Sequence, residues 1–272
     1  MLGWWIGVLL CCNGYSQQVK PDSLSGTQQE SQEQFHQSYK FSQFVQESVK
    51  FVKIPLYWKG SDWLKVGVIS LSTFACMPFD RAVTNTTRPN PHLYNSVPVI
   101  AGKIYGEWYT IGGIAASIGL YGLVAHNHES KNMALELFQA GLYSEGVTAI
   151  LKTAIGRERP THTNESFTFK PFTFLDDNYQ SMPSGHTTAA IALSTVLSRH
   201  AKTTFLKILA YVPAAFTIYS RIYQDQHWLS DVIPAMAIGY FAANWVVNLH
   251  ERNKHRVNLT SIYPPTFSIG LY

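Results

Sequence analysis

Six apolar segments, each long enough for several helical turns, are separated by polar or proline-containing connections. They run roughly over residues 63–79, 108–126, 132–155, 186–200, 204–220 and 228–249. None shows the apolar–polar alternation that is typical of a half-buried strand, and the core contains no internal repeat. The pattern therefore predicts an all-α protein, a helical bundle of about six core helices.

Composition leaves two environments open for this bundle. Hydrophobic residues make up 46% of the chain and charged residues 14%, and a membrane span needs about 20 apolar residues. Segments 108–126 and 228–249 approach that length, but two others contain Lys65 and Lys207, and the mean hydropathy is only −0.04. A buried core in a soluble protein is the alternative. Tryptophans near segment ends favour a membrane-associated bundle.

The chain divides into four parts by composition. We expect a signal peptide over residues 1–16, a polar N-terminal extension over 17–55, the main domain over 56–250 and a C-terminal tail over 251–272. The extension includes an amphipathic helix near Phe41–Val52. A signal peptide predicts an exported protein.

Cysteine usage and charge exclude two further possibilities. Cys11 and Cys12 lie in the signal segment, where a lipoprotein site is the weaker alternative, and Cys76 remains alone in the mature chain. No internal disulfide can form from a single cysteine. The formal charge of +4 comes from scattered basic residues, which gives no support for nucleic acid as a partner.

The first polar cluster between apolar segments is "KTAIGRERP". Lys152 and Arg159 lie seven residues apart, so they share one face if the helix reaches Arg159, whereas Arg157 points away from that face. Pro160 is a plausible terminator. Two cations on one face suit an anion, although for this cluster alone ordinary helix-end charges favoured by the macrodipole are the better explanation.

The second cluster, "MPSGHTTAAIALSTVL", contains a helix start. Ser184 is a good N-cap, Gly185 permits close approach of a ligand, and His186 stands in the first turn. The N–H groups of such a helix end bind anions. A capped helix with a merely polar histidine is the alternative.

The third cluster is "SRIYQDQHWLSD". His227 and Asp231 lie four residues apart, so on a helix they share a face, and the carboxylate can hold the imidazole ring in one orientation. The other ring nitrogen is then available to attack an electrophile. Arg221 adds a third cation. The alternative is a structural His–Asp pair.

Together the clusters favour a tetrahedral oxyanion over a metal ion, because a dense set of metal-ligating residues is absent from the sequence. If the helices alternate up and down, all three clusters meet at one end of the bundle. The opposite end receives basic residues, namely Lys131, Arg199, Lys202, Lys207, Arg252, Lys254 and Arg256. In a bacterial inner membrane, that basic side would face the cytoplasm, and the three clusters would face the periplasm.

These residues resemble the signature of the type 2 phosphatidic acid phosphatase (PAP2) family, which shares its core with bacterial class A acid phosphatases and vanadium haloperoxidases. The three-part signature K-x6-RP, PSGH and SR-x5-H-x3-D is complete and in order. The resemblance covers roughly residues 60–250, and three ordered motifs are far more specific than one short pattern.

The resemblance implies a role for each matching residue. His227 becomes the nucleophile that forms a phosphohistidine, Asp231 orients it, and His186 acts as acid and then as base. The groups that hold the phosphoryl oxygens are Lys152, Arg159, Ser184, Gly185 and Arg221. The family needs no metal or other cofactor for hydrolysis, and vanadate can mimic phosphate.

One position departs from the pattern. Many members have glycine two residues before the nucleophile, where this chain has Asp225. An acidic side chain that pointed inward would repel phosphate, so this departure bears on pocket shape and substrate preference.

The resemblance implies a metal-independent phosphatase acting on a phosphorylated lipid: phosphatidic acid, phosphatidylglycerophosphate, a polyprenyl diphosphate or lipid A. We expect it in the bacterial cell envelope, either in the inner membrane with a periplasm-facing site or in the periplasm. A vanadium-dependent haloperoxidase and a soluble broad-specificity acid phosphatase are the alternatives. A helical membrane protein with purely structural polar clusters leaves the three motifs unexplained.

Overall fold

The computed structural model describes residues 39–87, 93–174 and 176–262, with side chains up to residue 254. The predicted signal peptide, residues 17–38 of the polar extension and the last ten residues lie outside this described part. The main compact unit comprises Phe41–Arg256.

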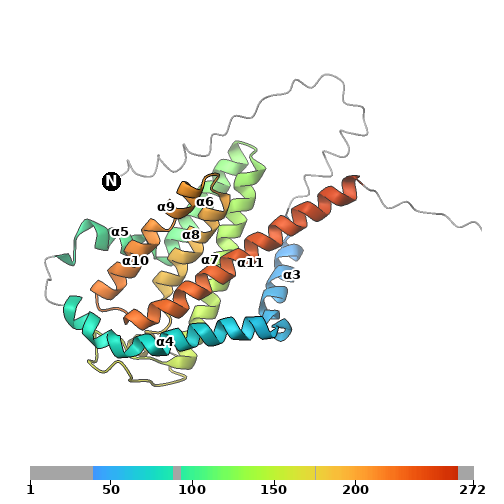
Figure 1. Ribbon diagram of the computed structural model, residues 1–272. Coiled ribbons are helices and arrows are strands. Elements are labelled where there is room, and N and C mark those ends of the chain that lie inside the picture. The colour runs from blue at the N-terminus through green and yellow to red at the C-terminus, as the bar shows by residue number, and fades with distance from the viewer. Residues whose placement is uncertain (1–38, 88–92, 175, 263–272) are drawn as a thin grey trace, which may run out of the picture. The chain divides into compact units, whose positions relative to one another are not determined.

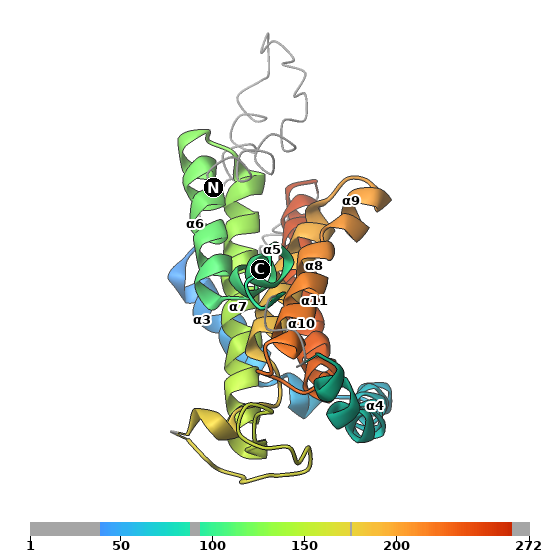
Figure 2. The same cartoon turned by 90° about the vertical axis from the view of Figure 1, so that its left-hand side faces the viewer.

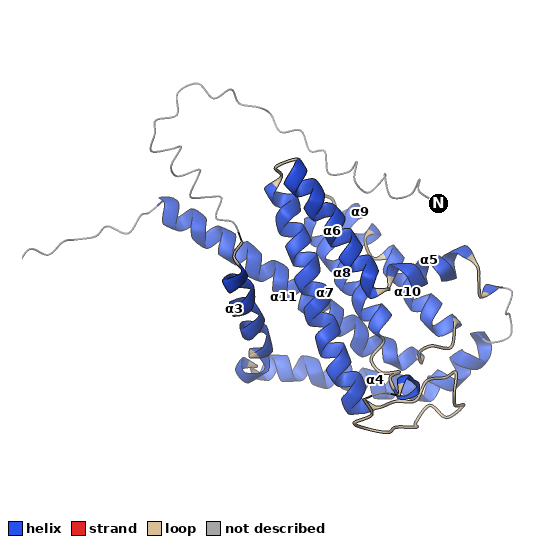
Figure 3. Ribbon diagram, turned by 180° about the vertical axis from the view of Figure 1, so that it is seen from behind, coloured by secondary structure: helices blue, strands red, loops and turns tan. Residues whose placement is uncertain are grey.

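The described part is helical, as predicted, and Figure 3 shows no strand within it. Helix α7 (His128–Ile155) packs against α6 (Trp108–Val124) and α8 (Gly185–His200), and Figures 1 and 2 both show the three as neighbours. Helix α11 (Leu229–Ile262) continues past residue 249, the predicted end of its apolar segment. The expectation of a helical bundle is confirmed.

Local sequence signals set the ends of the two helices that lead to the polar clusters. The Asn127 side chain caps the start of α7 by accepting from the Ser130 N–H, and α7 ends at Gly156, whose φ is +61°. Ser184 caps α8 by accepting from the Thr187 N–H. Side-chain oxygens at N-caps and glycine in the left-handed region are the usual solutions for unpaired backbone groups at helix ends.

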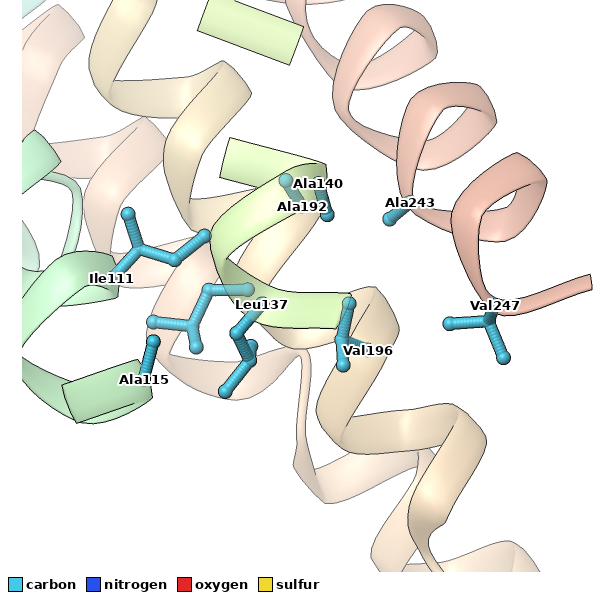
Figure 4. Close-up of a cluster of buried hydrophobic side chains, with 9 residues drawn as sticks. Ile111, Ala115, Leu137, Ala140, Ala192, Val196, Ala243 and Val247 are labelled. Atoms are coloured by element: carbon cyan, nitrogen blue, oxygen red, sulfur yellow. The ribbon is translucent and has the colours of Figure 1, made fainter. Parts of the chain in front are cut away.

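Small side chains let the central helices come close together. The main core cluster draws on α6, α7, α8 and α11, and alanine supplies four of its nine residues: Ile111, Ala115, Leu137, Ala140, Ala192, Leu193, Val196, Ala243 and Val247 (Figure 4). At Gly239 a Cβ would lie only 2.5 Å from the Thr188 carbonyl oxygen. Close backbone approach of this kind is typical of helices that pack through small residues.

Two segments differ from the predicted helix ranges. The stretch 204–220 is divided into α9 (Thr204–Leu209) and α10 (Val212–Tyr223), because Pro213 occupies the first turn of a new helix. Helix α5 (Val97–Tyr105), which the apolar segments did not reveal, packs on α10. Its short length explains why periodicity missed it.

The predicted amphipathic helix is α3 (Phe41–Val52), and the side that faces the protein combines polar and aromatic residues. Glu47 is buried and accepts from Gln139 at 2.8 Å, while Phe51 stacks on Tyr143. The outward side carries an apolar stripe, Phe41, Val45, Val49 and Val52. An exposed apolar stripe of this kind suits surroundings that are themselves apolar.

Three helical stretches are long and apolar enough to cross a membrane: α4 over Gly60–Thr87, α9–α10 over Thr204–Tyr223, and α11 over Leu229–Lys254. Large apolar side chains on α4 point outward, and Leu71 is 70% exposed. Length, composition and outward apolar surface therefore support membrane association rather than a soluble bundle.

Candidate active site

The three polar clusters meet at one end of the bundle, as the up–down alternation predicted. Lys152 lies in the last turn of α7, Gly185 and His186 begin α8, and Arg221 lies in the last turn of α10. The long connection from α7 to α8, which contains the short 3-10 helix η3 (Asp177–Tyr179), lies at the same end (Figure 1). His227 directly precedes α11, and its pKa responds to the charges of Lys152 and Arg159.

His227 is held by a backbone carbonyl rather than by a carboxylate. The sequence predicted a helical His227–Asp231 pair, but α11 begins at Leu229, so His227 precedes the helix. Its Nδ1 lies 2.7 Å from the Ser181 carbonyl oxygen and 3.8 Å from Asp231 Oδ2. Because that carbonyl can only accept, Nδ1 carries the proton and Nε2 has a free lone pair.

Burial keeps the His227 ring neutral. The side chain is 2% exposed, and this burial lowers the pKa of His227 to about 3, with the charges of Lys152 and Arg159 adding to the effect and Asp231 opposing it. Near neutral pH the ring is therefore an uncharged base beside cations, which is the state that a nucleophile requires.

Asp231 acts on His227 through its neighbours. Its Oδ2 accepts from the Ser181 hydroxyl at 2.5 Å and from the Trp228 N–H at 2.8 Å. The carboxylate therefore fixes Ser181, whose carbonyl holds the ring, and the residue that follows His227. The predicted orienting role of Asp231 would act through these two contacts together with its charge, which lies 3.8 Å from His227 Nδ1.

Arg157 is the residue beside the candidate site whose importance the sequence did not reveal. Its side chain is fully buried and forms ion pairs of 2.7 Å with both Asp231 and Asp80. It also donates to the Ser230 hydroxyl at 2.6 Å. A buried arginine is stable only when its donors are satisfied, and this one links α4, the α7–α8 connection and the start of α11. On a continuous helix through Lys152 and Arg159, Arg157 was expected to point away from the site.

Lys152 and Arg159 do not share a helix face, because the condition for it, a helix that reaches Arg159, is not met. Helix α7 ends at Ile155 and the chain turns at Gly156, so Arg159 stands in the connection. Lys152 Nζ donates to the Gln180 carbonyl oxygen, while Arg159 donates to Asp177 at 2.7 Å and to Gln226 Oε1 at 3.2 Å. Burial lowers the pKa of Lys152 to about 8, and its cationic form suits a bound anion.

His186 lies on another side of the site, beside Arg221 and Glu107. Its Nε2 is 3.2 Å from Glu107 Oε1 and 3.5 Å from Arg221 Nη1. Burial, followed by the Arg221 charge, lowers the pKa of His186 to about 4, against the effect of Glu107. Glu107, the residue before α6, was not predicted, since no motif connects it with the clusters.

Ser184 and Gly185 stand where the motif predicted. The Ser184 N–H donates to the Asp231 carbonyl oxygen at 3.2 Å, which joins the start of α8 to α11. A Cβ on Gly185 would lie 3.4 Å from Glu145 and 3.6 Å from the Lys152 side chain. The free N–H groups of this helix end therefore lie beside Lys152.

Asp225 has a backbone reason for standing where glycine is common. Its φ is +54°, in the left-handed region that glycine adopts freely and aspartate more readily than most residues.

Metal-ligating side chains do not gather in the part of the chain that the structure describes: no group of three or more His, Cys, Asp or Glu is placed to hold an ion. The site instead brings together three cations, Lys152, Arg159 and Arg221, while its carboxylates Glu107 and Asp231 lie beside the two histidines. The cations suit an anionic substrate directly.

An all-α bundle with a neutral buried histidine among cations defines a helical oxyanion-binding protein. The model of the PAP2 superfamily matches residues 134–255. A lipid A 1-phosphatase of Rhizobium etli is 32% identical over 210 residues, covering 68% of this chain and 82% of that protein. The chain belongs to the PAP2 superfamily, as the resemblance implied.

Two other similarities extend this result. A lipid A 4'-phosphatase of Porphyromonas gingivalis is 37% identical over 73 residues, which is 26% of this chain and only 31% of that protein. The crystal structure of a transmembrane PAP2-type phosphatidylglycerolphosphate phosphatase from Bacillus subtilis aligns with a TM-score of 0.50 at 21% identity, covering 71% of this chain and 95% of that one. The second similarity concerns the fold.

Proposed function

We propose that this protein is a metal-independent phosphatase that hydrolyses the phosphate of a lipid through a phosphohistidine. The observation that carries this proposal is the state of His227: its Nδ1 proton is directed to the Ser181 carbonyl at 2.7 Å, which leaves Nε2 unprotonated beside the charges of Lys152 and Arg159. A neutral nucleophile among cations matches an anionic phosphate that must be attacked at phosphorus.

In the first step, Nε2 of His227 forms a bond to phosphorus and the bond from phosphorus to the leaving oxygen breaks. Protonated His186 gives its proton to that oxygen. Burial lowers the pKa of His186 to about 4, and the negative charge of a bound phosphate raises it, so substrate binding itself favours the acid form. Lys152, Arg159 and Arg221 stabilise the charge on the remaining oxygens, together with the Ser184 hydroxyl and the Gly185 N–H.

In the second step, neutral His186 takes a proton from water and the resulting hydroxide attacks phosphorus. The bond to His227 breaks, orthophosphate leaves, and the ring returns to its neutral form. Asp231 and Ser181 hold the ring during both steps and stabilise its transient positive charge. No cofactor enters this scheme, and vanadate would bind as a mimic of phosphate.

The substrate class follows from surroundings and relatives. Helices long and apolar enough to cross a membrane support a lipid substrate, and two relatives of this chain carry the names lipid A 1-phosphatase and lipid A 4'-phosphatase. We therefore rank a phosphate group of lipid A first, ahead of phosphatidic acid, phosphatidylglycerophosphate and polyprenyl diphosphates. Such substrates agree with an exported, envelope-located protein whose site faces the periplasm.

The test is phosphate release in detergent from lipid A, phosphatidic acid and a polyprenyl diphosphate, compared with a water-soluble ester. We expect metal chelators to leave the activity unchanged and His227→Ala to abolish it. A His227→Ala protein that still released phosphate would refute the mechanism. Faster turnover of the soluble ester would favour a broad-specificity acid phosphatase, and halide oxidation that depends on added vanadate would favour a haloperoxidase.

A further inference from the structure

Glu107 is the acidic residue next to His186, and the two proposed steps leave it without a role. It directly precedes α6 and lies outside residues 134–255, the part that matches the PAP2 superfamily. Its side chain is 18% exposed, and its Oε1 lies 3.2 Å from Nε2 of His186. A carboxylate at that distance forms a hydrogen bond with the ring when Nε2 carries a proton.

The backbone of the turn before α6 is held against His186 by close packing. A Cβ at Gly106 would lie 2.8 Å from the His186 carbonyl oxygen and 2.9 Å from the His186 Cβ, so this position accommodates only glycine. The Glu107 N–H donates to the Ile104 carbonyl oxygen at 3.3 Å, and the Glu107 carbonyl accepts from the Thr110 N–H at 2.9 Å. The backbone that presents Glu107 to His186 is therefore fixed on both sides.

Two neighbours of His186 Nε2 require opposite states of that nitrogen. The carboxylate oxygen of Glu107 can only accept a hydrogen bond, so it pairs with Nε2 when Nε2 carries a proton. Arg221 Nη1 lies 3.5 Å from the same nitrogen and can only donate, so it pairs with Nε2 when Nε2 has a free lone pair. The acid form of His186 therefore matches Glu107, and the base form matches Arg221.

The charges around His186 act in the same two directions. Burial, followed by the charges of Arg221 and Lys152, lowers the pKa of His186 to about 4, whereas the charge and hydrogen bond of Glu107 oppose that shift. Arg221 and Lys152 are also groups that hold the phosphoryl oxygens in the proposed reaction. Because a bound phosphate offsets their positive charges, the effect of Glu107 on the ring is largest when substrate is present.

We propose that Glu107 is a positioning residue for the acid step: it holds His186 with the proton on Nε2 until the leaving oxygen takes that proton. The electron pair of the broken phosphorus–oxygen bond stays on the leaving oxygen, which accepts the Nε2 proton. In the base step Nε2 takes a proton from water, which restores the contact with Glu107. Glu107 itself gains and loses no proton. This inference rests on the proposed function, because the acid step is part of the proposed hydrolysis.

Two esters that differ in their leaving groups test this role. Release of octanol from octyl phosphate needs a proton, whereas release of nitrophenol from nitrophenyl phosphate does not. Glu107→Gln keeps the shape of the side chain and removes its charge. We expect octanol release in a single turnover to slow about tenfold, as follows if the pKa of His186 falls by about one. Nitrophenol release should stay unchanged.

The pH profile of octanol release gives an independent readout. The acid form of His186 is present below its pKa, so the rate falls as pH rises through that pKa. In Glu107→Gln this decline should begin about one pH unit lower, whereas Glu107→Asp keeps the charge and should keep the decline at its original pH. Loss of the Lys152 charge affects both esters alike, so the difference between the esters reports on His186.

The matched control is Glu165→Gln, which removes a charge from a side chain that is 73% exposed. It should leave both rates and the pH profile unchanged. Equal slowing of both esters by Glu107→Gln would overturn the inference, since that result assigns Glu107 to the shape of the turn. An unchanged pH profile in Glu107→Gln would overturn it too.

A titration followed by NMR separates this inference from the proposed function. In sulfate-bound protein with labelled histidine, where the His186→Asn spectrum identifies the resonance, the pKa of His186 should be lower in Glu107→Gln than in the unsubstituted protein. If the unsubstituted protein hydrolyses neither ester, the proposed function fails, and the titration still decides whether Glu107 holds the ring in its protonated form. An equal pKa in the two proteins would show that it does not.

Discussion

Arg157 and Asp231 meet at 2.7 Å between Nη1 and Oδ1, with both side chains fully buried. Asp231 in turn holds Ser181, whose carbonyl oxygen holds His227. The orientation of the proposed nucleophile therefore depends on a cation that makes no contact with substrate. Asp80 of α4 forms the second ion pair of the Arg157 guanidinium, through Nη2.

Loss of Arg157 should cost stability as well as activity. Arg157→Met leaves two buried carboxylates without their partner, and breaking a buried pair in this way costs about 3–5 kcal/mol. Thermal unfolding in detergent measures the loss. The control is Arg159→Met: its guanidinium is paired with the largely exposed Asp177, so activity should fall while stability changes by less than about 1 kcal/mol. Equal destabilisation by the two substitutions would contradict the network.

A trapping experiment should distinguish the role of His186 from that of His227. With an aryl phosphate, whose leaving group needs no proton, His186→Asn should still form the phosphohistidine but hydrolyse it slowly, because the base for water is missing. Radiolabelled phosphate should then accumulate on His227. The double variant with His227→Gln should retain no label, and label at another residue would rule out His227 as the nucleophile.

Anion binding should weaken as pH rises through about 8. The pKa of Lys152 is lowered to about 8 by burial, so its charge is present below that pH and lost above it. Sulfate, which remains a dianion across the range, should inhibit about tenfold less well at pH 9 than at pH 7 if only the charged form binds it. Lys152→Arg keeps its charge and should show a flat profile. A similar decline in that variant would assign the effect to another group.

Two glycines of the α7 region should respond in opposite directions to alanine. Gly156 has a φ of +61°, and a Cβ there would lie 1.8 Å from the Lys170 carbonyl oxygen, whereas a Cβ on Gly146 meets no atom within 4 Å. Gly156→Ala should destabilise by more than about 2 kcal/mol. Gly146→Ala, inside the helix, should stabilise by about 0.5–1 kcal/mol. Unfolding in denaturant compares the two, and a neutral Gly156→Ala would refute the requirement for a left-handed turn.

Helix positions and the clustered motifs could be predicted because each depends on neighbours in the chain. Apolar periodicity marked α4, α6, α7, α8 and α11, and short spacings such as the one from Arg221 to His227 marked the site. Prediction failed where a few backbone angles redirected the chain. The left-handed turn at Gly156 separates Lys152 from Arg159, and the late start of α11 leaves His227 outside the helix.

By itself the sequence determined the helical class, the approximate helix ranges and the residue types that converge on an anion, since these follow from composition and from spacing within single segments. Only the tertiary structure decided which side chains hold these residues in position. Asp80 and Arg157 are 77 residues apart in the chain, and no local pattern relates them. The partner of a buried charge is set by the tertiary fold. The residues that hold His227 in place could therefore be identified only from the packing of α4, the α7–α8 connection and α11.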